Sequence, residues 1–509
     1  MNEPTTERPD KAQLRTILTG LMLVLTLAAL DQNIVATALP RIVSDLGDAS
    51  HLSWIVTSYV LSSTITMPLY GKLSDQYGRK PLIYAAVGIF LAGSMLAALA
   101  QTMTQLILFR AVQGLGAGGL LPLVQITIGD VVSPRERGRY QGLFGAVFTG
   151  CSVAGPVLGG IITDALSWHW IFYVNLPFGA AALAFIAVGL RRPPAAIHHR
   201  IDYGGAALIA LGTTGLLLVM SLGGTSYDWN SPFIIGCALT ALFSIPLFLW
   251  QERRVAEPVM PLHLFGNPTV AICWAVLALA FTGMSAATVF FPLFFQLVLG
   301  VAPANSGLLT GPLMVGIVTS SVLGGRLVSR TGRYKPLPVV GLAAAALAFA
   351  GLGWSAFAGH GIWVMEPLLT ILGLGLGLVM PTMTVALQNA ANPRDMGVAT
   401  ATSAFFRSLG AVVGVAMSGG ILAIRLKSLL ATSALAGELD APTLLSAGVT
   451  QIAQMPAALA QGVTGFYRLA IGTTFLFGGA IIAIAFVVVL FLPELPLKSA
   501  VAKPVTQGD

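Results

Sequence analysis

Long apolar stretches separated by short polar segments run through nearly the whole sequence. Fourteen of these stretches have about the 20 residues that a helix needs to cross roughly 30 Å of hydrocarbon. Backbone polar groups must be hydrogen-bonded inside lipid, and the alternating segments of barrel strands are missing from the sequence, so the pattern predicts an all-α polytopic membrane protein. The expected spans are about 16–39, 53–71, 81–100, 104–128, 140–163, 169–190, 203–223, 232–250, 269–293, 305–325, 337–358, 362–388, 398–424 and 466–492.

The composition supports this class. Of the 509 residues, 56% are hydrophobic and only 9% are charged, whereas soluble proteins carry about 25% charged residues. The mean hydropathy is +0.83. The three cysteines, Cys151, Cys237 and Cys273, lie inside apolar stretches and are odd in number, so we expect no structural disulfide.

The distribution of Lys and Arg predicts the orientation. With the N-terminus placed in the cytoplasm, 21 of the 27 basic residues fall in inner segments and three fall in outer segments. This bias predicts a multi-pass protein of the cytoplasmic (inner) membrane with both termini cytoplasmic, including the tails 1–15 and 493–509. The net charge of +7 is spread over short loops rather than gathered on a polar domain, so we expect no nucleic-acid partner.

Two polar loops occur twice in the chain. "GKLSDQYGRKPL" at 71–82 is similar to "GRLVSRTGRYKPL" at 325–337, and "SPRERG" at 133–138 is similar to "NPRDMG" at 392–397. The two offsets, 254 and 259, nearly agree, so the first six spans repeat as the last six. Two bundles with a binding site at their interface are typical of many secondary transporters.

The repeat predicts the domain organisation. We expect a six-helix bundle at 16–190, a linker with two inserted helices at 191–268, and a second six-helix bundle at 269–492 that includes an outer loop at 425–465. We expect the protein to be a monomer.

Four motifs resemble one known family. They are "LDQNIVATALP" in the first span, "GKLSDQYGRKP" in the loop between spans two and three, "RAVQGLGAGG" in the fourth span and "GPVLGG" in the fifth. With them, nearly the whole chain resembles the major facilitator superfamily and, within it, the fourteen-helix drug–proton antiporters of bacteria. The resemblance implies the major facilitator fold and a secondary active transporter rather than an enzyme. It also implies multidrug efflux driven by the proton gradient, without a cofactor or metal.

The second motif contains a candidate conformational latch, formed by Gly71, Asp75, Gly78 and Arg79. The charge bias explains the basic residues of this loop but does not explain Asp75. An acid at the inner end of a helix can stabilise one state by pairing with an arginine or with a helix N-terminus. The second copy of the loop has Ser329 in place of the acid, so we expect the latch in one half only.

The "GPVLGG" motif has two interpretations. Gly155 and Gly159 have the spacing that lets two membrane helices pack closely, and Pro156 removes a backbone hydrogen bond. The resemblance implies that Gly155, Pro156, Gly159 and Gly160 influence the direction of exchange. Packing and a transport role are compatible with each other.

Asp31 and Arg110 are the candidate proton-coupling residues. Asp31 lies about eight residues, or ~12 Å, from the outer edge of its span, and Arg110 lies about six residues, or ~9 Å, from the same edge. Opposite charges at similar depth in a membrane are expected to face the bundle interior and to pair. Our hypothesis is that Asp31 binds the proton and Arg110 tunes its affinity. The alternative is a permanent ion pair that holds two helices together.

Two further charges are secondary candidates. Glu366 is expected near the outer interface, where exposure is cheap, while Arg407 lies about nine residues, or ~14 Å, inside its span and needs a partner or water. The six histidines show no spacing typical of metal ligands.

The leading hypothesis is a proton-coupled antiporter that exports hydrophobic, often cationic compounds by alternating access. Residues suited to an apolar binding site are Phe291, Phe294, Phe295, Met380 and Met383. The alternative within transport is a lipid or lipid-like substrate. An intramembrane enzyme would need paired catalytic groups at one depth, and Asp31 is the only acid placed well inside a span, so this class is disfavoured.

Overall fold

The computed structural model describes residues 10–47, 51–190, 202–224, 227–433, 452 and 454–498. The first half of the described chain forms α1 (Lys11–Leu46), α2 (Leu52–Tyr77), α3 (Arg79–Ala98), α4 (Met103–Val131), α5 (Pro134–Ala165), α6 (Trp170–Tyr173) and α7 (Asn175–Gly189). The middle forms α8 (Tyr203–Leu222), α9 (Pro232–Glu252) and the short 3₁₀ helix η2 (Leu262–Gly266). The second half forms α10 (Pro268–Leu297), α11 (Pro303–Leu309), α12 (Gly311–Thr331), α13 (Pro336–Ala358), α14 (Ile362–Ala390), η3 (Pro393–Asp395), α15 (Met396–Ala431) and α18 (Ala457–Leu490).

Fourteen helical segments in the described ranges are long and apolar enough to cross a membrane, as the sequence predicts. Three of them join consecutive elements: α6 with α7, α11 with α12, and η3 with α15. We call the side that carries the turn between α2 and α3 the inner side, and the opposite side the outer side.

The helices are longer than the apolar stretches alone indicate. Asp10 caps α1 by accepting a hydrogen bond from the backbone N–H of Gln13 at 2.6 Å, which places the start of the helix before the apolar residues. Pro40 does not end this helix, because the helix continues to Leu46 and ends at Gly47, whose φ is +69°. A proline removes only one backbone bond, and the helix tolerates this loss near its end.

Helices extend into the expected outer loop at 425–465 from both ends. Helix α15 continues through Ala431 and α18 begins at Ala457, so Arg425 and Lys427 are helical. The central part of that loop lies outside the described residues.

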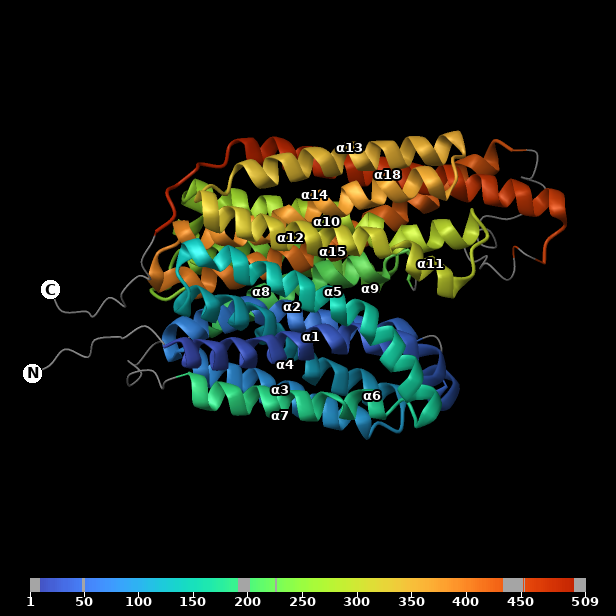
Figure 1. Cartoon of the computed structure of the whole chain (residues 1–509). Coiled ribbons are helices and arrows are strands. Elements are labelled where there is room, and N and C mark those ends of the chain that lie inside the picture. Colours follow the sequence, from blue (N-terminus) through green and yellow to red (C-terminus); the bar gives the residue numbers. More distant parts are fainter. Residues whose placement is uncertain are drawn as a thin grey trace, which may run out of the picture.

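The packing of the helices repeats between the two halves. In the first half α1 packs against α5 and α7, and α4 packs against α2 and α3. In the second half α10 packs against α15 and α18, and α14 packs against α12 and α13. Figure 1 shows the two sets as two layers, with α8 and α9 between them in this view. These two helices pack against each other, and α8 also contacts α2 and α15.

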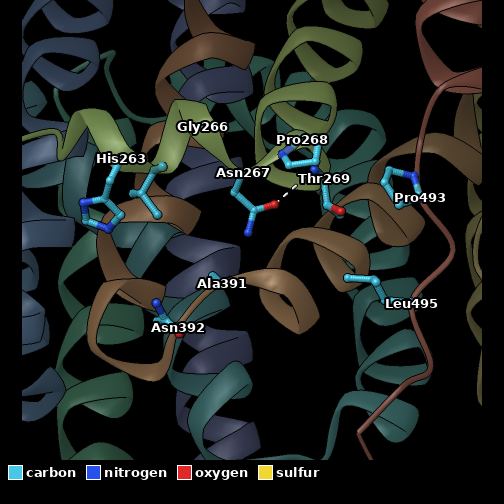
Figure 2. Close-up of a pocket in the computed structure, with 10 residues that line it drawn as sticks. His263, Gly266, Asn267, Pro268, Thr269, Ala391, Asn392, Pro493 and Leu495 are labelled. Carbon is cyan, nitrogen blue, oxygen red and sulfur yellow. Dashed lines mark hydrogen bonds between the residues drawn. The ribbon is translucent and has the colours of Figure 1, made fainter.

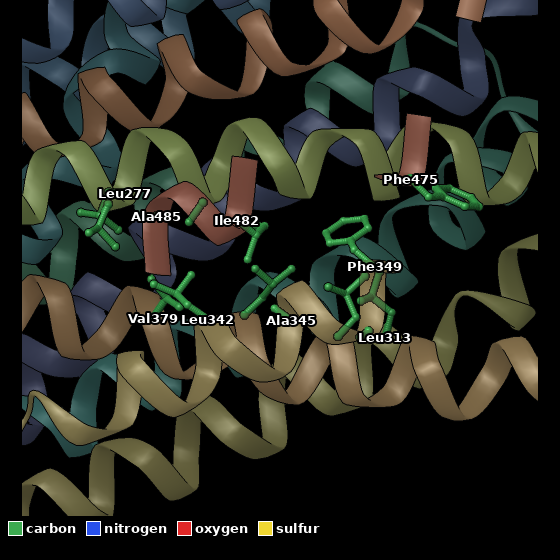
Figure 3. Close-up of a cluster of buried hydrophobic side chains, with 14 of the residues drawn as sticks. Leu277, Leu313, Leu342, Ala345, Phe349, Val379, Phe475, Ile482 and Ala485 are labelled. Atoms are coloured by element: carbon green, nitrogen blue, oxygen red, sulfur yellow. The ribbon is translucent and has the colours of Figure 1, made fainter. Parts of the chain in front are cut away.

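Each half has its own apolar core. In the second half Leu342, Phe349 and Phe475 are fully buried among α10, α13, α14 and α18 (Figure 3). A corresponding cluster around Phe90 and Val124 lies in the first half. Two separately packed cores allow the halves to move as units, which an alternating-access transporter requires.

The charge pattern and the even number of spans predict that both ends of the chain lie in the cytoplasm. Alkaline phosphatase fused after Gln507 should therefore be inactive, and the same reporter inserted after Asp228, between α8 and α9, should be active. Enzyme activity of the first fusion at the level of the second would contradict this topology.

Candidate functional site

A large cavity lies between the two halves. It has a volume of about 1720 Å³ and is lined by residues from α1, α2, α4, α5, α8, α10, α12, α14 and α15. It extends to Val56 at the outer end of α2, to Trp229 in the loop before α9 and to Ile424 near the outer end of α15, all of which are exposed. Its deep end includes Met67 and Ser321. Because its exposed lining residues lie at the outer ends of their helices, the cavity is accessible from the outer side.

Small residues close the inner side beneath this cavity. A Cβ atom on Gly71 would contact Ala401 and would lie 2.8 Å from the carbonyl oxygen of Gly397, so α2 and α15 are in backbone contact. The equivalent contact in the other half joins α12 and α5, where a Cβ atom on Gly138 would lie 2.6 Å from the carbonyl oxygen of Gly325. The structure is therefore open outward and closed inward.

Asp75 has both of the partners that the sequence suggests. Its Oδ1 accepts a hydrogen bond from Arg79 at 2.6 Å and from the backbone N–H of Gly397 at 3.0 Å, and its Oδ2 accepts one from the N–H of Val398 at 2.9 Å. Arg79 also binds Asp130 on α4 at 2.7 Å. The carboxylate thus joins its own half to the positive N-terminus of α15 across the closed inner side.

The remaining latch residue, Gly78, ends α2 with φ of +88°, a conformation that side chains disfavour. It makes the tight turn that brings Arg79 next to Asp75.

The other half has no charged latch at the equivalent place. The Ser329 hydroxyl donates only to the carbonyl oxygen of Gly325, four residues earlier on the same helix. Instead, Arg135 at the start of α5 donates to the carbonyl oxygens of Ser329 at 3.0 Å and of Arg330 at 3.3 Å. Because Arg135 is exposed, water competes with these bonds.

Asp31 and Arg110 form a buried ion pair. The Arg110 guanidinium lies 2.9 Å from Asp31 Oδ2, and both side chains are almost completely inaccessible. Gln113 and Asn175 donate to Asp31 Oδ1 at 2.8 and 2.9 Å. The Arg110 guanidinium also lies 4.1 Å from the ring centre of Tyr59 on α2. The carboxylate thus accepts three hydrogen bonds, from Arg110 and Gln113 on α4 and from Asn175 on α7.

This network differs from expectation in one respect. Arg110 and Tyr59 line the cavity, whereas Asp31 is fully buried behind Arg110 and does not line it. A substrate in the cavity therefore meets Arg110 before it can reach Asp31. The roles of Gln113 and Asn175 were not foreseen; Gln113 follows Arg110 by three residues and so lies on the same helix face.

The sequence of the chain matches the model of the Major Facilitator Superfamily at residues 21–207 and 203–415. The chain belongs to this superfamily. It is 38% identical over 458 residues to the multidrug transporter protein MdtP of Bacillus subtilis, covering 90% of this chain and 84% of that protein. It is also 38% identical to multidrug resistance protein 3 of B. subtilis over 421 residues, covering 82% and 81%.

Solved structures agree on the fold. The proton:xylose symporter XylE aligns with a TM-score of 0.66 at 15% identity, covering 96% of this chain and 98% of that one. The human organic anion transporter MFSD10 aligns with a TM-score of 0.63 at 14% identity, covering 93% and 99%. The predicted family and fold are confirmed, and this member of the superfamily is a transporter rather than an enzyme.

The "GPVLGG" motif of the transporter packs α5 against α1. A Cβ atom on Gly155 would lie 2.6 Å from Asn33 Cβ, and one on Gly159 would lie 2.7 Å from the carbonyl oxygen of Ile34. Gly160 has open space at the same position, and Pro156 is exposed inside a continuous helix. The packing interpretation therefore applies to Gly155 and Gly159, which face α1. The effect of the motif on the direction of exchange stays a prediction.

The two secondary candidates lie in different places. Glu366 is half-buried on α14 and does not line the cavity. Arg407 lines the cavity and is 6% exposed, with its guanidinium 5.2 Å from the ring centre of Phe281. The structure does not bring the two together at this cavity.

The expected apolar site residues are mostly part of the core. Phe291, Phe294, Phe295 and Met383 are fully buried in the second half and do not line the cavity, whereas Met380 does. An apolar sequence pattern cannot distinguish a residue that faces the cavity from one that faces a neighbouring helix.

A smaller pocket of about 560 Å³ lies on the inner side, apart from the central cavity (Figure 2). It is formed where η2, the connection from α14 to α15 and the segment after α18 meet, next to His263, Asn392 and Pro493. Asn267 caps α10 there by accepting from the N–H of Thr269 at 3.1 Å. The pocket lies where chain segments join and not between the two halves.

The "GPVLGG" glycines give a matched test of packing. Gly159→Ala should destabilise the transporter by about 1–3 kcal/mol, because the new methyl group would contact Thr37 and Ile34. Gly160→Ala should leave stability unchanged or raise it slightly, since alanine favours helices and the site is open. Thermal unfolding of both variants in detergent checks this, and equal midpoints would contradict the packing.

The latch predicts unequal effects in the two halves. Asp75→Asn should keep the fold but weaken inner closure by roughly tenfold in equilibrium constant, because a charge-assisted contact to Arg79 and to the α15 N-terminus is lost. Ser329→Ala should be nearly silent, since that hydroxyl bonds only within its own helix.

Transport rate, together with labelling of a cysteine introduced at Ala401, measures this difference. Ala401 is buried against Gly71 in the closed state, so its labelling reports inner opening. Equal behaviour of the Asp75 and Ser329 variants would show that the latch is not asymmetric.

Proposed function

We propose that the protein is a proton-coupled antiporter that exports hydrophobic small molecules by alternating access. It would reside as a monomer in the cytoplasmic membrane with both termini inside, and the proton gradient would supply the energy without a cofactor. Membership of the superfamily and the two multidrug relatives support export of drug-like compounds.

The observation that carries the proposal is the ion pair of Asp31 and Arg110 at the cavity wall. A proton on Asp31 would cancel the charge that holds Arg110, and movement of Arg110 would in turn change the proton affinity of Asp31. Because Arg110 also faces the cavity, substrate and proton can influence each other through this one side chain. If the pair were permanent, Arg110 would not move, and substrate binding could not change the proton affinity of Asp31.

The cavity is wide enough for bulky substrates. Its volume of about 1720 Å³ exceeds the 300–1,000 Å³ that is usual for small-molecule sites. This size keeps lipid-like substrates as the second candidate. The resemblance also implies cationic compounds, but the buried Arg407 in the cavity lining disfavours a second positive charge nearby.

Transport is tested with purified protein in liposomes under an imposed proton gradient. The substrate panel should contain cationic, neutral and anionic dyes together with a fluorescent phospholipid. Uptake that depends on the proton gradient and disappears with a protonophore would support the proposal, and gradient-independent movement of every compound would contradict it.

Asp31→Asn should remove proton release on substrate addition while leaving the protein folded and able to bind substrate, because asparagine keeps the shape but cannot titrate. The matched control is Asp45→Asn at the outer end of the same helix, where the pair with Arg41 is exposed and contributes little. Proton release from the Asp31 variant at the wild-type level would exclude Asp31 as the carrier.

A further inference from the structure

The central cavity contains a buried cation without a counterion. Arg407 is 6% exposed, lines the cavity and makes no hydrogen bond or ion pair with any residue that the structure describes. It lies on α15 about 11 residues, or ~16 Å, from one end of the helix and about 24 residues, or ~36 Å, from the other. Its five N–H donors therefore have no acceptor among the described residues and face whatever occupies the cavity.

The other charges of the cavity do not balance Arg407. Arg110 is already neutralised by Asp31 and donates to Gln113 at 2.7 Å. Lys427 and Asp228 also line the cavity, but both are exposed at its outer mouth. The deep part of the cavity therefore carries one net positive charge, located on Arg407.

The deep part of the cavity presents no carboxylate to a cation among its lining residues. Asp228 lies at the outer mouth, and Asp31, the buried acid of this region, is hydrogen-bonded to Arg110, Gln113 and Asn175 and does not line the cavity. A cation entering the deep cavity would meet the like charge of Arg407 instead.

The surroundings of Arg407 suit a ligand with an apolar body. Its guanidinium lies near the ring of Phe281, and Met284, Phe290 and Met380 also line the cavity. Ser408, the next residue in the chain, also lines the cavity, and its hydroxyl is hydrogen-bonded to the Thr64 hydroxyl with 2.7 Å between the two oxygens. A planar guanidinium beside apolar walls binds carboxylate, sulfonate or phosphate oxygens through paired hydrogen bonds.

The internal repeat shows that this cation is particular to one half. The offset of 259 residues that relates the start of α15 to the start of α5 places Phe148 at the position equivalent to Arg407. Phe148 also lines the cavity. The position equivalent to Arg407 in the first half is thus apolar.

From these observations we propose that the transport cavity binds amphipathic anions, with the anionic group of the ligand on Arg407 and its apolar body against the aromatic and methionine side chains. This inference rests on the proposed function, because it takes the central cavity as the transport site, and it replaces the cationic preference that the family resemblance implies. The anionic group can belong to a small molecule or to a lipid.

Equilibrium binding without a proton gradient separates this inference from proton coupling. The protein is reconstituted in nanodiscs of phosphatidylcholine, with empty nanodiscs as the blank. The probes are 8-anilinonaphthalene-1-sulfonate, its uncharged analogue N-phenyl-1-naphthylamine, and the cation ethidium. We expect the wild-type protein to bind the sulfonate about tenfold or more tightly than the uncharged analogue, since a charge-assisted hydrogen bond supplies that difference.

The variants assign the preference to Arg407. Arg407→Gln should weaken binding of the sulfonate by about tenfold or more and leave the uncharged analogue within about twofold, whereas Arg407→Lys should retain part of the preference. Arg425→Gln, which removes an exposed charge from the same helix outside the cavity lining, should change sulfonate affinity by less than about twofold. Binding of the uncharged analogue shows that each variant is folded.

Unchanged sulfonate affinity in Arg407→Gln, or tighter binding of ethidium than of the sulfonate by the wild type, would overturn the inference. Competition by phosphatidylglycerol that depends on Arg407 would support it with a lipid as the source of the anion, and sulfonate binding without such competition would support it with a small molecule. Proton-driven transport is measured separately, so loss of coupling would contradict the proposed function and leave the anion site standing.

Discussion

The cost of a charged group away from water governs this transporter. Inside a bilayer a charge must be paired, hydrogen-bonded or in contact with water. The structure meets this requirement in three ways. Asp31 is paired with Arg110 in a network that also uses Gln113 and Asn175, Asp75 is paired with an arginine and a helix N-terminus at the inner edge, and Arg407 faces the cavity.

In the proposed alternating-access cycle, each solution would serve one step. The contacts of Asp75 exist only while α2 and α15 are joined on the inner side, so they stabilise the outward-open state. The Asp31 pair links a titratable group to the cavity wall through Arg110. Arg407 remains available to a ligand. The close glycine contacts allow the halves to seal without large side chains that would have to move aside.

Much of this arrangement could be predicted from the sequence because charges are rare in it. Asp31 and Arg110 stood out in apolar stretches, and counting residues placed them at one depth. The repeated loop indicated that Asp75 would act in one half only. These predictions succeed because the membrane fixes helix direction and depth, so position in the chain converts into position in space.

Other features depend on contacts that spacing does not encode. The polar partners Gln113 and Asn175 are uncharged and gave no signal of their depth. The apolar pattern places the end of the first span at about residue 39, whereas α1 continues through Pro40 to Leu46. Whether an aromatic residue such as Phe294 faces the cavity or the core depends on the rotation of its helix. In a helix that is apolar on every side, the sequence does not indicate that rotation. The sequence showed that Arg407 needed a partner or water, and only the packed helices show that it faces the cavity.

The central claim is that protonation of Asp31 decides which side of the transporter is open. Distances between spin labels at Val56 on α2 and Ile424 on α15, both at the cavity mouth, measure outer opening directly by pulsed electron resonance. In the wild-type protein, lowering the pH should shift the population from the long distance to the short one. In Asp31→Asn the distribution at neutral pH should already resemble that of the wild type at low pH. A wild-type pH response that persists unchanged in the Asn variant would contradict the account.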